Sequence, residues 1–311
     1  MSDSGSEKGE ADRRTSVSKL SDFDALWDYE QPGPTERKFR QLLPAALDSL
    51  DISYLAELLT QIARAEAMQK KFSEAQKTLD RVEKALPKAD QRVSVRYVLE
   101  RGRVLSLSGK PREAQPRLRE AFNLALMLKM DLHAIDAARM MAVAESEKAL
   151  EWNMKALDLA EKSADAGANM AKGPLYSSIG WNHFERKEYQ EALFMFQKYL
   201  ESCGQLGDPL KIRTAKWSVA KVLRVIEHTE EALEMQRKLF EEYQGEGKRN
   251  GYVYEEIAEC LLVMGQAEEA EGWFAAAYAE ISKDPRIARD QNRLNRLKEL
   301  GAVGKPRPTP A

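Results

Sequence analysis

Residues 176–196 read YSSIGWNHFERKEYQEALFMF, and this stretch decides the fold. Its apolar residues recur at spacings of three and four, as they do on one face of an α-helix. Gly180 and Ala192 are two small residues twelve positions apart, and the polar pair Arg186 and Lys187 lies between them. Two antiparallel helices joined by a short turn approach closely only where their facing side chains are small. The stretch therefore predicts a helical hairpin.

The same twelve-residue spacing of small residues recurs along the chain. Successive alanines of the second helix lie 35 to 43 residues apart, and strand-like alternation is absent between them. A period of this length is typical of an α-helical solenoid, in which each hairpin covers only its neighbours. The six pairs are Ala63/Ala75, Gly102/Ala114, Ala137/Ala149, Gly180/Ala192, Ala220/Ala232 and Ala258/Ala270.

These hairpins resemble the tetratricopeptide repeat, and in their length they are similar to the arrays of kinesin light chain type. The resemblance implies an all-α protein, an α-solenoid of about six helix-turn-helix repeats with capping helices at both ends. In the third and fifth copies Asn153 and Gln236 replace a large apolar residue, so weaker local packing is expected there. The clearest copies carry Tyr176, Ile179, Gly180, His183, Tyr189, Ala192 and Phe196, and Tyr254, Ile257, Ala258, Leu261, Ala270 and Phe274.

The ends of the chain differ in composition from the repeats. Residues 1–34 are mostly polar at their start, which predicts disorder, and the aromatic segment around Trp27 is expected to strap the first repeat. Thr35 is a candidate helix cap. The predicted organisation is a tail over 1–34, a capping helix over 35–51, the repeat array over 52–284, a capping helix over 285–301 and a Pro-rich tail over 302–311.

Charge and composition exclude some classes of partner. The chain has 48 Lys and Arg against 50 Asp and Glu, and a general nucleic-acid binder needs a basic excess. Apolar runs are too short to cross a bilayer, so neither nucleic acid nor membrane is expected as a partner. The polar start lacks a signal-peptide core, and Cys203 and Cys260 make no disulfide framework. A cytoplasmic location is therefore expected.

Residues for catalysis are scarce. The chain has three histidines, His133, His183 and His228, which are expected in packing or surface roles. Phosphate-binding glycine loops and zinc-binding helix motifs are absent. We therefore expect no enzyme activity, no catalytic residue, no metal and no cofactor. The tail sequence around Ser16 follows two arginines and is a candidate phosphorylation site for a basophilic kinase.

The resemblance also implies where a ligand would bind, because the first helix of each repeat lines the concave surface of such arrays. The implied groove has a basic beginning, an aromatic middle and an acidic end. An alternative is that Trp181 and Trp217 belong partly to the core. The implied groove residues are Arg64, Arg96, Arg103, Trp181, Phe184, Trp217, Lys221, Arg224, Glu255 and Glu259.

The sequence thus predicts a protein-interaction scaffold whose groove holds a polypeptide with an acidic portion and an apolar anchor. One alternative is a non-catalytic regulatory subunit of an enzyme complex. Another is an RNA-binding helical repeat protein, which would need a continuous basic groove that Glu255 and Glu259 interrupt. Homo-oligomerisation also stays open.

Overall fold

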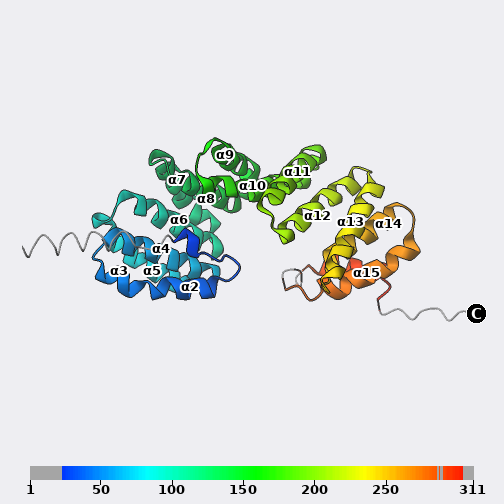
Figure 1. Cartoon of the computed structure of the whole chain (residues 1–311), viewed down its shortest axis with the longest axis horizontal. Helices are drawn as coiled ribbons and strands as arrows, with labels where there is room; N and C mark the ends of the chain where they lie inside the picture. Colours follow the sequence, from blue (N-terminus) through cyan, green and yellow to red (C-terminus); the bar gives the residue numbers. More distant parts are fainter. Residues whose placement is uncertain (1–22, 286, 288–289, 304–311) are drawn as a thin grey trace, which may run out of the picture. The chain divides into compact units, whose positions relative to one another are not determined.

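The computed structural model describes residues 23–285, 287 and 290–303, and all regular structure in these residues is helical. The predicted all-α class is thereby confirmed. The chain divides into two compact units, Met1–Ala171 and Lys172–Ala311, and the division falls within helix α10 (Ala166–Glu185). Each unit is built from antiparallel helix pairs, whose members are called the first and second helix below (Figure 1).

Unit 1 contains three complete pairs, α4/α5, α6/α7 and α8/α9, and two short helices that pack on the first pair. The first helices also contact one another, α4 with α6 and α6 with α8. The elements are η1 (Asp24–Leu26), α2 (Pro32–Gln41), α3 (Leu43–Asp48), α4 (Ile52–Met68), α5 (Phe72–Ala85), η2 (Leu86–Lys88), α6 (Gln91–Leu107), α7 (Pro111–Met127), α8 (Asp131–Ala144), η3 (Ser146–Lys148) and α9 (Ala149–Lys162).

Unit 2 contains the greater part of α10 and the pairs α12/α13 and α14/α15, followed by a terminal helix that packs on α15. Its apolar core runs from Ala192 to Leu297. The elements after α10 are α11 (Tyr189–Leu206), α12 (Pro209–Val225), α13 (Thr229–Gly245), α14 (Gly251–Val263), α15 (Ala267–Ile281) and α16 (Gln291–Leu300).

The small residues of the first helices make the close contacts that the spacing predicts, but with a different partner. A Cβ atom added to Gly180 would lie 2.7 Å from the ring of Phe196, and one added to Gly102 would lie 2.6 Å from Leu118. Both neighbours stand four residues after the alanine of the second helix. The small residue therefore makes room for the large side chain one turn further on.

The third and fifth copies depart from this pattern, as their sequences indicate. In the third, Ala149 opens α9 after the turn η3 instead of lying inside the helix, and Trp152 is buried beside Phe122. In the fifth, Gln236 takes the place of Phe196 and is fully buried. Its amide nitrogen and oxygen have no hydrogen-bond partner among the described residues. The fifth repeat thus contains an unsatisfied polar group in its core.

The N-terminal cap begins earlier than Thr35. Helix α2 starts at Pro32, whose fixed φ and missing N–H suit the first helical position. Thr35 is buried inside the helix, and its hydroxyl donates to the Asp28 carbonyl at 3.1 Å. The residues before α2 pack over the N-terminal end of unit 1. Phe23 is buried, and the centroid of its ring lies 4.8 Å from that of the Tyr54 ring.

The C-terminal cap also differs from its predicted start at residue 285, because α16 begins at Gln291. The Asp290 carboxylate accepts from the backbone N–H of Arg293 and caps the helix. Leu294 and Leu297 are buried against the array, as a capping helix requires. Among the described residues no helix is long and apolar enough to cross a membrane.

Candidate functional site

The first-helix face of unit 1 is centred on a buried ion cluster. The Arg103 guanidinium donates to Glu100 at 2.8 Å and to Asp136 at 2.5 Å, and Arg64 reaches the same Asp136 oxygen at 3.3 Å. Burial raises the pKa of Asp136, but the facing arginines outweigh it and keep the pKa well below its usual range. Since Arg64 lies on α4 and Asp136 on α8, the cluster joins the first repeat to the third.

Two further groups extend this face. Arg96 on α6 pairs with Glu57 on α4 at 2.9 Å. His133 on α8 is partly buried, and burial together with the charges of Arg96 and Arg64 lowers its pKa to about 3. The imidazole is therefore neutral at physiological pH.

An aromatic strap, residues 23–31, covers the N-terminal end of the same face. The indole N–H of Trp27 donates to Gln61 on α4 at 2.8 Å, and the ring stacks on Tyr29 with centroids 4.9 Å apart. The Arg64 guanidinium lies 5.3 Å from the centroids of both rings. The strap thus holds Arg64 by cation–π contacts while Asp136 neutralises it. This is the packing role expected for Trp27.

The first-helix face of unit 2 carries a row of aromatic rings from three successive first helices. The centroids of Trp181 (α10) and Trp217 (α12) are 5.9 Å apart, and those of Trp217 and Tyr252 (α14) are 6.3 Å apart. The Trp217 indole donates to the Tyr252 carbonyl at 3.1 Å. Phe184 extends the row, 5.5 Å from Trp181. All four side chains are partly buried, so each is in part core and in part surface.

Next to this row two cations share one carboxylate. Lys221 and Arg224 on α12 both pair with Glu256 on α14, Arg224 at 2.9 Å. Burial raises the pKa of Glu256, but the two cations lower it by more than burial raises it, so the carboxylate stays ionised. The Lys221 ammonium also lies 5.3 Å from the centroid of the Trp217 ring. The arrangement leaves one positive charge in excess beside an aromatic surface.

The glutamates at the expected acidic end of the groove are neutralised by ion pairs within the protein. Glu255 pairs with Arg293 at 3.1 Å, and Glu259 pairs with Arg296 at 3.1 Å. Both arginines come from the capping helix α16. In unit 1 the expected exposure of Arg103 is likewise not found, because only 7% of the residue is exposed. The expected division into a basic and an acidic end therefore ignored the intramolecular ion pairs.

Asp136 and Glu256, the carboxylates at the centre of the two faces, were missed by sequence reasoning. A usable signal exists in their spacing, because each lies about one repeat after the arginine that it pairs with. Arg103 precedes Asp136 by 33 residues, and Arg224 precedes Glu256 by 32. Opposite charges one repeat apart on first helices predict ion pairs between neighbouring repeats.

The remaining candidate groups show no catalytic arrangement. His183 hydrogen-bonds Glu188 at 2.6 Å in the turn after α10, and His228 lies in the exposed turn before α13. Cys203 and Cys260 are free and buried. Among the described residues no group of three or more His, Cys, Asp or Glu side chains is placed to hold a metal ion. Ser16 lies outside the described residues.

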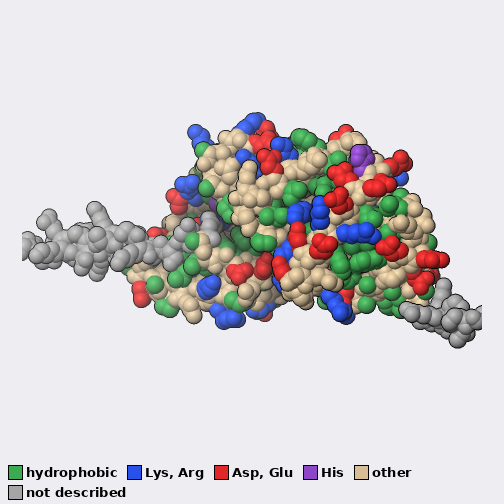
Figure 2. Space-filling view, turned by 45° about the vertical axis from the view of Figure 1, so that its right-hand side comes forward, with side chains coloured by type: hydrophobic (Ala, Val, Ile, Leu, Met, Phe, Trp, Pro, Cys, Tyr) green, Lys and Arg blue, Asp and Glu red, His purple; other side chains and the backbone are tan. Residues whose placement is uncertain are grey.

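Charges of both signs are interspersed on the surface. On the face seen in Figure 2, Lys and Arg lie among Asp and Glu, with hydrophobic side chains between them. This agrees with the many ion pairs between neighbouring helices, such as Lys216 with Glu242 and Arg237 with Glu269. A long basic stripe of the kind that follows a phosphate backbone is not visible on this face.

Comparison with known proteins identifies the fold. No protein-family model matches the sequence, and no curated protein matches it. Among solved structures, a STAND (signal transduction ATPase with numerous domains) protein with a tetratricopeptide repeat sensor, from Pyrococcus horikoshii, aligns over 88% of this chain with a TM-score of 0.65 and 16% identity. This chain covers 45% of that protein.

Two further structures support the same conclusion. NprR in complex with its cognate peptide NprX aligns over 96% of this chain and 86% of its own, with a TM-score of 0.55 and 16% identity. A putative kinesin light chain from Podosopora anserina with nearly identical repeats aligns over 62% of this chain and 97% of its own, with a TM-score of 0.50 and 15% identity. The fold is that of tetratricopeptide-repeat solenoids, as the repeat pattern predicts.

Proposed function

We propose that this chain is a non-catalytic interaction scaffold, and that the first-helix face of unit 2 binds a segment of a partner polypeptide. The observation that carries the proposal is the aromatic row of Trp181, Trp217 and Tyr252 beside the cation pair of Lys221 and Arg224. Tryptophan, tyrosine and arginine are the residues that most often dominate binding energy at interfaces. A partly exposed row of them offers anchoring points to a ligand.

The chemistry of the face suggests the ligand. An apolar or aromatic side chain would cover the ring surfaces, and a carboxylate would meet the excess positive charge around Glu256. A peptide with an apolar anchor and an acidic residue matches both features. Peptide binding by NprR, which has the same fold, is a precedent for this use of the architecture.

The arginines on the first-helix face of unit 1 are less accessible to a ligand. Arg64, Arg96 and Arg103 each have an intramolecular carboxylate partner. A ligand would have to compete with Glu57, Glu100 or Asp136 to reach them. Replacing Arg103 would also leave buried carboxylates without their cation, which costs several kcal/mol. Loss of binding in such a variant would not separate recognition from folding.

A cleaner test uses matched substitutions in unit 2. Peptides are selected from a displayed random library on the full-length protein, and their affinities are measured for Lys221→Met and Phe184→Ala. The controls are Lys198→Met and Phe194→Ala, which remove the same side chains from the second helix α11. Phe194 is 53% exposed and lies on a second helix, whereas the aromatic row lies on first helices.

We expect each face variant to weaken binding about tenfold or more, equivalent to about 1.4 kcal/mol. The controls should change it by less than about twofold. Selected peptides should be enriched in acidic and aromatic residues. Equal affinity for all four variants would contradict the proposed face. An RNA ligand would instead show an affinity that falls steeply with salt, and a regulatory subunit would copurify with an enzyme and change its rate.

A further inference from the structure

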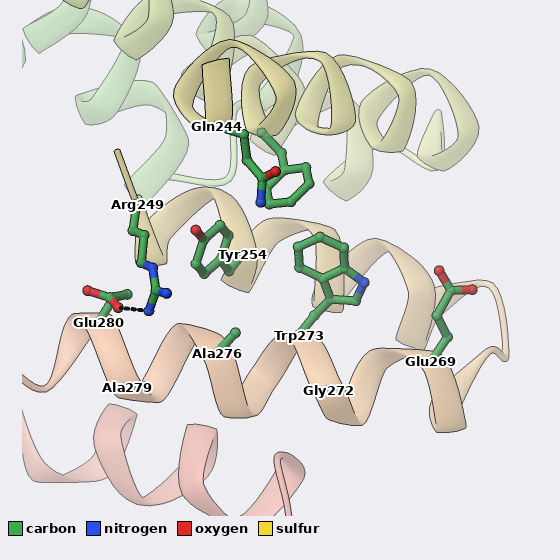
Figure 3. A pocket seen from close by; sticks show the side chains of 10 residues that line it. Gln244, Arg249, Tyr254, Glu269, Gly272, Trp273, Ala276, Ala279 and Glu280 are labelled. Carbon is green, nitrogen blue, oxygen red and sulfur yellow. Dashed lines mark hydrogen bonds and ion pairs between the residues drawn. The ribbon is translucent and has the colours of Figure 1, made fainter. Parts of the chain in front are cut away.

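A separate groove lies on the second-helix side of unit 2. It has a volume of about 460 Å³ and runs between α13 and α15, with α14 beneath it (Figure 3). Tyr254 and Trp273 lie at its base, Phe240 stands on the α13 side, and Gly272 and Ala276 form the α15 side. None of these residues belongs to the aromatic row of the first-helix face.

The groove exists because α15 has small outward-facing residues. Gly272, Ala276 and Ala279 stand two, six and nine residues after Ala270. A Cβ added to Gly272 would meet nothing within 4 Å. A glycine inside a helix costs about 1 kcal/mol relative to alanine, so this opening is kept at the expense of stability. The equivalent positions in α11 and α13 hold Phe194, Lys198, Glu201, Glu234, Lys238 and Glu241.

The lining favours one kind of ligand. Phe240 and Trp273 meet edge to face with centroids 5.0 Å apart, and Tyr254 lies 5.8 Å from both. Aromatic-lined grooves of this type bind proline-rich segments, which arrive already extended and lose little entropy on binding. Helices α13 and α15 together carry nine glutamates against Arg237 and Lys238, so this side of unit 2 is acidic. The two carboxylates that line the groove have partners, since Glu269 pairs with Arg237 and Glu280 pairs with Arg249, which also lines the groove. The ligand should therefore combine proline with positive charge.

A segment with this composition follows α16 in the same chain. Residues 304–310 read GKPRPTP, in which three prolines alternate with other residues and two side chains are basic. Helix α16 ends against α15, since a Cβ added to Gly301 would lie 2.5 Å from the backbone nitrogen of Ala275. Gly301, three residues before the segment, therefore lies beside the helix that forms one wall of the groove.

The length of the segment allows it to reach the groove. Seven residues in the polyproline II conformation span about 22 Å, whereas a helix with its side chains is about 10–12 Å across. We propose that residues 304–310 bind in this groove as an extended segment, with prolines on Trp273 and Tyr254 and with Lys305 and Arg307 near the glutamates of α13 and α15. This proposal is independent of the function proposed for the first-helix face.

Contact between the segment and Trp273 can be measured in the full-length protein. Thr309→Cys provides a single accessible thiol for a bimane dye, because Cys203 and Cys260 are buried. Bimane is quenched when it touches tryptophan. We expect quenched fluorescence that Trp273→Phe raises severalfold, since this change removes the quencher and keeps an aromatic groove. High salt should also raise it, because the attraction is partly ionic.

The matched pair Gly272→Arg and Gly272→Ala separates docking from proximity. Both side chains fit at this open position, but the arginine fills the groove and repels the basic segment, whereas alanine leaves the groove open. We expect Gly272→Arg to relieve quenching and Gly272→Ala to keep it. The same fluorescence in all variants would overturn the proposal. Quenching that increases with protein concentration would also overturn it, because the segment would then come from a second copy.

Discussion

Because Gly180 lies in close contact with Phe196, we expect a side chain at position 180 to lower the stability of the protein. A Cβ at position 180 would lie 2.7, 2.8 and 3.0 Å from three carbons of the Phe196 ring, whereas unstrained carbon atoms stay 3.5–4.0 Å apart. The Phe196 ring is fully buried, and its centroid lies 4.9 Å from that of the Trp181 ring. The Phe196 ring therefore has little room to move. Overpacking of this kind costs about 1–3 kcal/mol.

Gly180→Ala also gains helix propensity, worth about 1 kcal/mol, which would mask part of the cost. Gly272→Ala is the matched control, because it makes the same gain at a helical position where a Cβ meets nothing within 4 Å. Both positions lie in unit 2. We expect Gly272→Ala to be more stable than Gly180→Ala by about 1–3 kcal/mol.

The assay is urea unfolding of both variants and the wild type, followed by far-UV circular dichroism. The slopes of the transitions should agree, so that the midpoints report stability alone. If Gly180→Ala gained as much stability as Gly272→Ala, the helices α10 and α11 would not be in close contact at this point. The explanation of the twelve-residue repeat spacing would then be refuted.

Three further predictions concern single side chains. Gln236→Met keeps the size of a buried side chain and removes its unsatisfied amide, so it should stabilise unit 2 by about 1–2 kcal/mol in urea unfolding; a loss of stability would mean that the amide has a partner. The pKa of His133 is about 3 in the folded protein and about 6.5 when unfolded. The unfolded state therefore takes up the proton first, and stability falls by about 2 kcal/mol between pH 7 and pH 5. His133→Gln should lose about that much less over the same range, and an unchanged pH dependence would argue against a neutral, buried imidazole. Trp27→Ala removes the hydrogen bond to Gln61 and the ring contacts with Phe39 and Arg64, so it should destabilise unit 1 by about 2–4 kcal/mol in thermal unfolding; a neutral effect would show that the strap does not support the first repeat.

The repeat architecture could be predicted because it depends on a local and recurring pattern. Pairs such as Gly102 and Ala114 mark the hairpins whatever surrounds them, and the six pairs of small residues fall in the helix pairs of the structure. The exact ends of the array could not be predicted in the same way. Helix α2 begins at Pro32, whereas Thr35 offered the stronger capping signal but lies inside the helix.

The candidate site was predicted less completely, because its electrostatics depends on residues one or two repeats apart. The positions of Lys221, Arg224 and Trp217 on the first-helix face follow from the repeat register. Their partners do not, since Glu256 becomes their counter-ion only when α12 packs beside α14. The groove on the second-helix side was not foreseen either, although the small residues from Gly272 onward distinguish α15 from the other second helices.

The ion pair between Arg64 and Asp136 has a consequence for how unit 1 comes apart. A solenoid held together only by neighbouring repeats can fray from its ends, one hairpin at a time. Here, detaching α4 would remove Arg64 from Asp136 on α8. Unfolding of the first repeat therefore costs additional free energy, because it breaks an ion pair with the third repeat. Amide protons of α4 and α8 should therefore exchange with solvent as members of one cooperative block. Mechanical pulling from the N-terminal side should likewise release these repeats in a single step.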